Sequence, residues 1–186
     1  MTRLHKIHTG LELDHPHVHG DTWSWNTTTS GQDRLVIAPS GRHIALMQRL
    51  AEVLEPPFFL LFVLSVPRGD DAAGRYQSPP LERDVAHAIL DRFSDFFEQD
   101  ARHNIWLASA DGSSMLVYDE HDVIYAYGPF NEMIDILEAE GLREGPHTIP
   151  DPHGHPFHPE FDDAQHQLVS VEEFWHVTPL QPQDER

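Results

Sequence analysis

The stretch HNIWLASADGSSMLVYDEHDVIYAYG, residues 103–128, decides the fold class of this chain. Three runs within it are rich in aromatic and β-branched residues, which favour strands. They are residues 104–110, 114–118 and 123–127. Asp111 and Gly112 separate the first two runs and suit a tight hairpin, because glycine tolerates positive φ. The stretch therefore predicts a three-stranded antiparallel meander over 104–127.

The last two strands of this meander are apolar on both faces, which is typical of central strands in a sheet. The apolar pattern predicts further strands on the N-terminal side of the meander, at 21–27, 34–38 and 58–66. It predicts three helices, at about 40–54, 80–99 and 129–141. We expect an α+β (mixed α/β) fold, with a central, mostly antiparallel sheet of about five to seven strands and three helices.

Helix ends and connections can also be predicted. Ser40 is placed to cap the first helix, and Gly141 to close the third in a left-handed conformation with Leu142 folding back. The strand, helix and strand over 34–66 favour a right-handed crossover. The 14 residues from Pro67 to Pro80 are expected to form a loop, a candidate lid or partner-facing segment.

The C-terminal part of the chain is harder to interpret. Residues 143–165 are rich in Pro, Gly and His and are expected to be irregular. Residues 167–177 fit either a strand or, through a capping box at 170–173, a short helix.

A length of 186 residues indicates one domain with a core large enough to need no staple. We expect a His-rich arm or loop at 1–20, a single domain at 21–178 and a frayed tail at 179–186. Cysteine is absent, which excludes disulfides, thiolate zinc sites and cysteine nucleophiles. No run of secretory or membrane-spanning length is found, so the expected location is cytoplasmic.

The charge balance favours some partners over others. Lys and Arg number 12 against 31 Asp and Glu, a net charge of −19, which disfavours nucleic acid and anionic membranes. A basic protein or a cation fits this charge better. An acidic stripe is predicted along one face of the 80–99 helix, comprising Asp84, His87, Asp91, Asp95 and Glu98. The leading hypothesis is a non-catalytic protein that docks or neutralises a basic protein through this stripe.

Histidine is the strongest compositional anomaly. Of 15 histidines, five lie in residues 4–19 and five in residues 147–166. Alternating histidines on extended chain place their imidazoles on one side, where they can share zinc, nickel or copper. The candidate ligands are His15, His17, His19, His153, His155 and His158. The alternative hypothesis is therefore a metal-dependent enzyme or metal-handling protein. A third is a protein whose assembly responds to pH, since protonating all 15 would change the charge from −19 to −4.

The second turn of the meander offers a further constellation. Asp119, Glu120, His121 and Asp122 contain the groups of a general base and its orienting carboxylate, although such residues are also ordinary in turns. Phosphate-binding glycine loops, the nucleophile elbow and the HExxH helix are absent from the sequence. These absences favour a non-catalytic protein and leave the question of an enzyme open.

Overall fold

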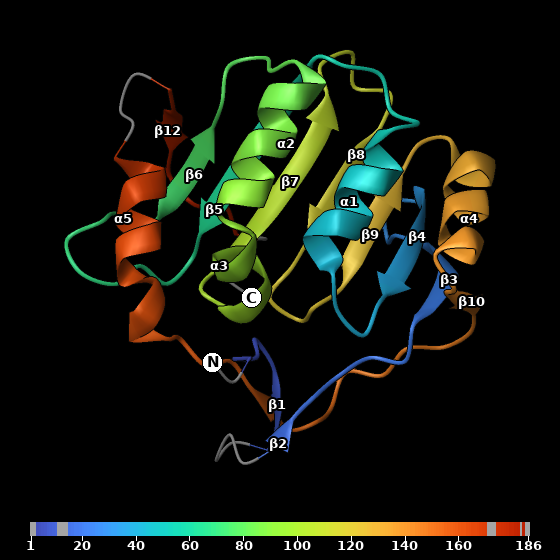
Figure 1. Cartoon of the computed structure of the whole chain (residues 1–186), viewed down its shortest axis with the longest axis horizontal. Coiled ribbons are helices and arrows are strands. Elements are labelled where there is room, and N and C mark those ends of the chain that lie inside the picture. The colour runs from blue at the N-terminus through green and yellow to red at the C-terminus, as the bar shows by residue number, and fades with distance from the viewer. Residues whose placement is uncertain (1–2, 11–14, 171–173, 183, 185–186) are drawn as a thin grey trace.

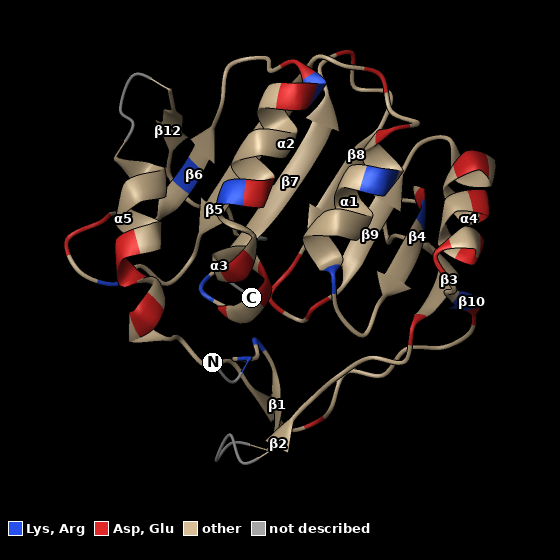
Figure 2. Cartoon of the chain, viewed as in Figure 1, with Lys and Arg blue, Asp and Glu red and all other residues tan. Residues whose placement is uncertain are grey.

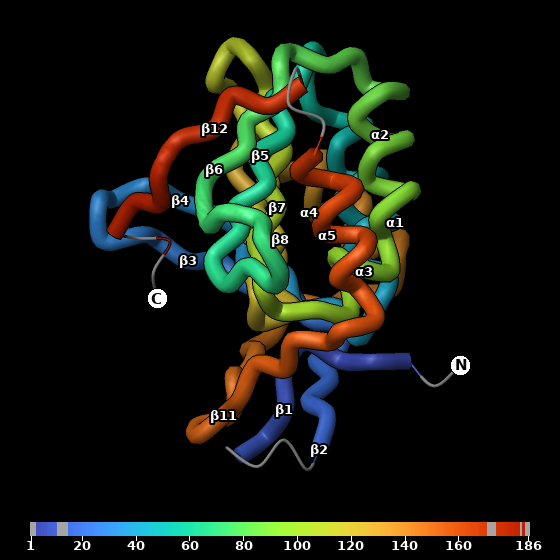
Figure 3. Tube along the Cα trace, turned by 90° about the vertical axis from the view of Figure 1, so that its left-hand side faces the viewer, coloured from blue at the N-terminus to red at the C-terminus, as the bar shows by residue number. Residues whose placement is uncertain are grey.

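The computed structural model describes residues 3–10, 15–170, 174–182 and 184. In this part of the chain a nine-stranded sheet forms the centre, and five α-helices cover one of its faces (Figures 1 and 3). The class is the predicted α+β, and both the strands and the helices outnumber those that the sequence indicated. No helix among the described residues is long and apolar enough to cross a membrane.

The predicted meander lies at the middle of the sheet. The strands are β3 (Thr22–Thr27), β4 (Asp33–Ala38), β5 (Phe58–Leu64), β6 (Gly74–Gln77), β7 (His103–Ser109), β8 (Met115–Tyr118), β9 (Ile124–Tyr127), β10 (Arg143–Glu144) and β12 (His176–Thr178). Their order is β10-β3-β4-β9-β8-β7-β5-β6-β12, and every pair is antiparallel except β10 with β3. The meander β7-β8-β9 is thus confirmed, with β8 as the central strand.

Two connections differ from what the sequence indicated. β4 and β5 share the sheet but are not neighbours, because the whole meander lies between them. The segment 67–80 is not a plain loop, since it contains β6, which pairs with β5 and β12. Residues 143–165, expected to be irregular, include β10 and the start of a helix.

The helices are α1 (His43–Ala51), α2 (Arg83–Arg92), α3 (Ser94–Gln99), α4 (Phe130–Ala139) and α5 (Asp162–Val169), with a 3₁₀ turn at Pro159–Phe161. The single helix expected over 80–99 is broken at Phe93, whose φ of −110° and ψ of 15° are not helical. Val85, expected to face inward, is 47% exposed.

The structure tests two predicted helix ends, the start of α1 and the end of α4. The cap at Ser40 is wrong, because α1 begins after Arg42 and the Ser40 hydroxyl donates to Asp21 instead. The end of α4 is confirmed: Gly141 has a φ of 89°, and the amide of Leu142 donates to the carbonyl of Leu137. The side chain of Leu142 is buried in the core cluster that also contains Met133 and Leu137 of α4.

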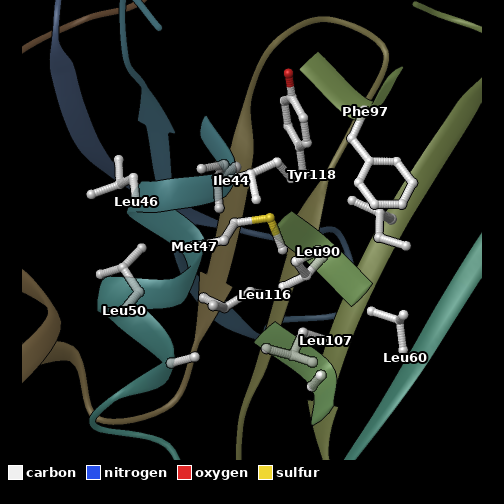
Figure 4. Packing of buried hydrophobic residues seen from close by; sticks show 14 of the residues in the cluster. Ile44, Leu46, Met47, Leu50, Leu60, Leu90, Phe97, Leu107, Leu116 and Tyr118 are labelled. Atoms are coloured by element: carbon white, nitrogen blue, oxygen red, sulfur yellow. The ribbon is translucent and has the colours of Figure 1, made fainter. Parts of the chain in front are cut away.

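The core lies between the sheet and the helices (Figure 4). Met47 and Leu50 of α1 and Leu90 of α2 meet Leu107 and Leu116 of the meander, and all five are fully buried. Each such side chain contributes about 1.5–3 kcal/mol by leaving water. Because the helices cover one face only, the opposite face of the central strands is free to form a site.

The two indoles of β3 have different environments. Trp23 is buried, whereas Trp25 is 49% exposed and packs edge-on against Phe130 of α4. The sequence predicted that the same face of this strand would bury both. Trp25 lies toward the end of the strand, where the helix gives only partial cover.

The N-terminal arm packs on the domain. A second sheet has the order β11-β1-β2 and consists of β1 (His8–Thr9), β2 (His15–Pro16) and β11 (His153–Gly154). Lys6 and Ile7, just before β1, are fully buried. The two His-rich segments therefore meet in this small sheet (Figure 3).

The ambiguous stretch 167–177 divides into two parts. Its first residues complete α5, and its last belong to β12. The predicted capping box at 170–173 lies largely outside the described residues.

Candidate metal centre

His121 is held in the turn between β8 and β9 by the side chain of Asp119. One carboxylate oxygen accepts the backbone N–H groups of His121 and Val123, at 2.9 and 3.0 Å. The other accepts the His121 ring Nδ1–H at 3.1 Å. Asp122 completes the turn with a φ of 59°. A single aspartate thus shapes the turn and orients the imidazole.

His153 and His155 are held on strand β11 and its continuation. Alternate residues of an extended chain project to the same side, so this H-x-H pair presents both rings together. The Nδ1–H of His153 donates to the carbonyl of Pro150 at 2.7 Å. The Nδ1–H of His155 donates to the carbonyl of Lys6 at 3.3 Å. The loop and the N-terminal arm therefore fix the two rings.

The three imidazoles of His121, His153 and His155 converge. Their ring centroids are 5.2, 4.9 and 5.0 Å apart, with every pair of rings near perpendicular. One ligand atom from each lies within 4.8 Å of the others. Within the described ranges, this is the one group of three such side chains close enough to share a metal ion.

The hydrogen bonds also select the nitrogen that is left for a ligand. Each Nδ1 has an oxygen acceptor, so each Nε2 carries the lone pair of a neutral imidazole. Metal-ligating histidines typically donate their second ring N–H to a carboxylate or a carbonyl. Two nitrogens on a tetrahedral zinc would be roughly 3.3 Å apart, so the three rings, whose ligand atoms lie within 4.8 Å of one another, would have to move closer around an ion. The residues present therefore fit a metal ion.

Burial and neighbouring charges shift the pKa values of His121 and His155 in opposite directions. Burial alone would lower the pKa of His121, but the hydrogen bond and charge of Asp119 outweigh it and raise that pKa. Burial, together with the nearby His121, lowers the pKa of His155 to about 4. His155 is thus neutral over the physiological range, as a metal ligand must be.

Only two of the six predicted metal ligands are in this group. His15 is exposed on β2. The ring of His17 donates to the ring of His19 at 3.3 Å, and His19 donates to the carbonyl of His121 at 2.8 Å. The ring of His158 donates to the carbonyl of His5 at 3.3 Å. The third imidazole, His121, comes from the meander turn that the sequence singled out for a different role.

Lys6 of the N-terminal arm contacts the residues that hold the centre. The buried ammonium of Lys6 donates to the carbonyl of Asp119 at 3.0 Å and lies 3.9 Å from the centre of the Tyr118 ring. The carbonyl of Lys6 accepts the ring N–H of His155. One arm residue thus contacts both segments that supply the imidazoles.

The other residues of the turn have separate surroundings. Asp122 is buried and accepts the Tyr118 hydroxyl at 2.7 Å, while His43 stacks on that ring. Glu120 is half-buried beside His121. The hypothesis of a general base at this turn stays a prediction.

The acidic stripe is divided between solvent and intramolecular contacts. Asp84 and Asp95 are exposed. Gln48 of α1 donates to the carboxylate of Asp91, and Glu98 accepts the Ile44 amide of α1 and pairs with Arg3. His87 is half-buried, and its carbonyl also accepts from Gln48.

Figure 2 shows acidic residues on α4 and α5 as well as along α2 and α3. The negative charge is therefore spread over the helical side of the molecule. Docking of a basic partner stays a prediction, and the stripe stands out little from its surroundings.

Comparison with known proteins adds no family. The chain matches no protein-family model, no curated protein and no solved structure.

Proposed function

We propose that this chain binds one divalent transition-metal ion through His121, His153 and His155, and that it is a metal-dependent enzyme. The observation that carries the proposal is the convergence of three imidazoles whose Nδ1–H groups all donate to oxygens. A hydrogen bond from the second ring nitrogen of a metal-binding histidine orients the ring and raises its basicity.

The donor set favours zinc among the three candidate ions. Neutral imidazole nitrogens suit zinc, copper and nickel, but three converging nitrogens match the three-histidine zinc sites best. Structural zinc sites use four protein ligands, whereas catalytic sites use three and leave the fourth position for water. The three candidate ligands among the described residues equal the number that catalytic zinc sites use, which supports the proposal of an enzyme.

The chemistry supplied by such an ion is Lewis-acid activation of water or of a carbonyl group. The chain's own residues hold the ligands in place: Asp119 on His121, Pro150 on His153 and Lys6 on His155. They also keep each imidazole in the tautomer that leaves Nε2 available.

Zinc titration of untagged, chelator-stripped chain tests the binding. We expect one equivalent to bind to the wild type and no measurable binding in the double variant His153→Ala/His155→Ala. The double variant His15→Ala/His17→Ala is the matched control, because it removes the same H-x-H pattern from the other His-rich segment. Unchanged affinity in the first variant, or equal loss in both, refutes the assignment.

Hydrolysis of p-nitrophenyl acetate distinguishes an enzyme from a metal-handling protein. An open zinc position is expected to give zinc-dependent hydrolysis that EDTA abolishes and zinc restores. A chain that binds one zinc tightly but shows no hydrolysis above the zinc-free protein would instead be a metal-handling protein.

A further inference from the structure

A groove of about 410 Å³ is lined by residues of β7, β8 and β9 that point away from the helices. Figure 3 shows that the helices lie on the other side of the central sheet. The size of the groove is that of a small-molecule site. His121 lines one end of this groove, so the groove and the three-histidine centre share a residue. Ile149, in the segment that leads to His153, lines it too.

The floor of the groove is built by strand register. Trp106 is opposite Val117, and Val117 is opposite Tyr125, so these three form a row across β7, β8 and β9. Met115 and Tyr127 form the next row. All five are half-buried, whereas the alternate residues of the same strands are fully buried under the helices. The groove thus presents three aromatic rings to an occupant.

Among the described residues that line the groove, Arg34 is the one cation; Arg75, which pairs with Asp184, lies 5.2 Å from the centre of the Trp106 ring. The guanidinium of Arg34 lies 4.2 Å from the centre of the Tyr125 ring and donates to Asn26 at 2.9 Å and to the Tyr127 hydroxyl at 3.4 Å. Among the described residues, no carboxylate pairs with it within ion-pair distance. Arginine has five N–H donors in a planar fork, so donors remain for an anion.

The acidic groups of the groove are engaged differently. Asp184 pairs with Arg75 at 2.7 Å, and Asp119 is bound to His121. Glu120, next to His121, lies at the metal end. Arg34 is reached from that end by way of Tyr125, whose hydroxyl donates to Asp119 at 3.4 Å. From the end at His121, the groove would therefore present the metal ion, then the aromatic rings and then the guanidinium of Arg34.

We propose that this groove binds a small aromatic molecule that carries an anionic group. The occupant's ring packs on Trp106 and Tyr125, its anionic group bonds to Arg34, and an oxygen atom at its other end coordinates the ion. Charge complementarity selects an anion, because Arg34 faces the groove without a carboxylate partner in a chain of charge −19. This inference rests on the proposed metal site.

Three hydroxamates test the inference on zinc-loaded protein. Acetohydroxamate reports chelation of zinc alone, benzohydroxamate adds a ring, and 4-carboxybenzohydroxamate adds an anion. We expect affinity to rise about tenfold with the ring and about tenfold again with the carboxylate. Isothermal titration calorimetry measures the three affinities.

Two variants with matched controls assign the two increments. Trp106→Leu is expected to remove most of the increment due to the ring, and Arg34→Gln the increment due to the carboxylate. Trp25→Leu and Arg143→Gln alter a tryptophan and an arginine outside the groove lining and should preserve both. Circular dichroism and unchanged acetohydroxamate binding establish that each variant remains folded with an intact zinc site.

The outcomes separate the two proposals. Zinc uptake with equal affinities for acetohydroxamate and benzohydroxamate overturns the groove and leaves the metal site standing. Ring and carboxylate increments that survive Trp106→Leu and Arg34→Gln also overturn it. A chain that takes up no zinc overturns both.

Discussion

The two His-rich segments contain the same number of histidines but differ in geometry. In residues 147–166, His153 and His155 direct their Nδ1–H groups at fixed carbonyls and converge with His121. In residues 4–19, the ring of His17 donates to the ring of His19, and the ring of His19 donates to the carbonyl of His121. A site depends on where the second nitrogen of each imidazole points, and composition does not contain that information.

The largest expected effect is the loss of the ligand outside both segments. His121→Ala leaves two of three imidazoles, so zinc affinity should fall on the order of 100-fold or more, beyond the usual effect of losing an outer partner. His158→Ala is the control, because this residue belongs to the C-terminal segment but contacts His5 rather than the cluster. Competition with a chromophoric chelator measures both. Equal losses of zinc affinity in the two variants would show that binding depends on the number of histidines and not on the three that converge.

Zinc should also stabilise the chain through the C-terminal segment only. At a free zinc concentration of about 100 times Kd, a ligand bound only to the native state adds about 2.7 kcal/mol. For a chain of 186 residues that corresponds to a rise in Tm of roughly 5–10 °C. Melting curves with zinc and with EDTA measure it. The rise should persist in His15→Ala/His17→Ala and vanish in His153→Ala/His155→Ala, and the reverse result would contradict the comparison.

A smaller effect is expected from the partner of His121. Asp119→Asn keeps an oxygen for the two backbone N–H groups of the turn but presents an amide N–H to the imidazole Nδ1. Zinc affinity should fall about 10–100-fold. Asp111→Asn is a matched control, because Asp111 makes the same contact to a backbone amide in the other hairpin and touches no imidazole. An unchanged affinity in Asp119→Asn would mean that the ring is oriented by other contacts.

The smallest effect concerns acid stability, to which the buried His43 and His103, outside both segments, contribute together with His155. Burial lowers the pKa of His43 to about 4. Burial, with the charges of Lys6 and Arg102, lowers the pKa of His103 well below its usual value. Unfolded histidines take up protons near pH 6.5 while these two stay neutral, so stability falls as the pH drops from 6.5 toward 4.

His103→Phe tests this assignment. His103 lies among Phe62, Phe96 and Phe97, and both of its ring nitrogens are buried without a hydrogen-bond partner in the described structure. The variant should lose less Tm than the wild type between pH 7 and pH 5, by a few degrees. Parallel slopes for the two proteins would move the acid sensitivity back to the His-rich segments.

The sequence was informative where local chemistry dominates. Asp111-Gly112 and the aromatic runs predicted the meander, and Gly141 with Leu142 predicted the end of α4, because turns and caps depend on a few adjacent residues. The break at Phe93 was missed, since apolar spacing continues through it. The separation of β4 from β5 by the meander was also beyond prediction, because strand order depends on long-range pairing.

Part of the geometry of the candidate site was accessible from the sequence for the same reason. The H-x-H spacing identified His153 and His155, whose shared direction is local. His121 was singled out as part of a candidate general base and not as a metal ligand, because its contact with His153 and His155 depends on long-range packing. The sequence signal that it carried was an aspartate two positions earlier, the residue that orients its ring.

The buried Lys6 makes the N-terminal arm a thermodynamic partner of the centre. Its carbonyl holds His155, and its ammonium holds the turn that carries His121. Because coupling between two sites is reciprocal, an ion bound by the imidazoles must tighten the arm, and anything that displaces the arm must weaken the ion. The amide of His17, which donates to the carbonyl of Ile7, would exchange its hydrogen more slowly in the metal-bound chain. A protein that binds residues 3–9 and displaces them from the domain would therefore lower the metal affinity without contacting the metal site.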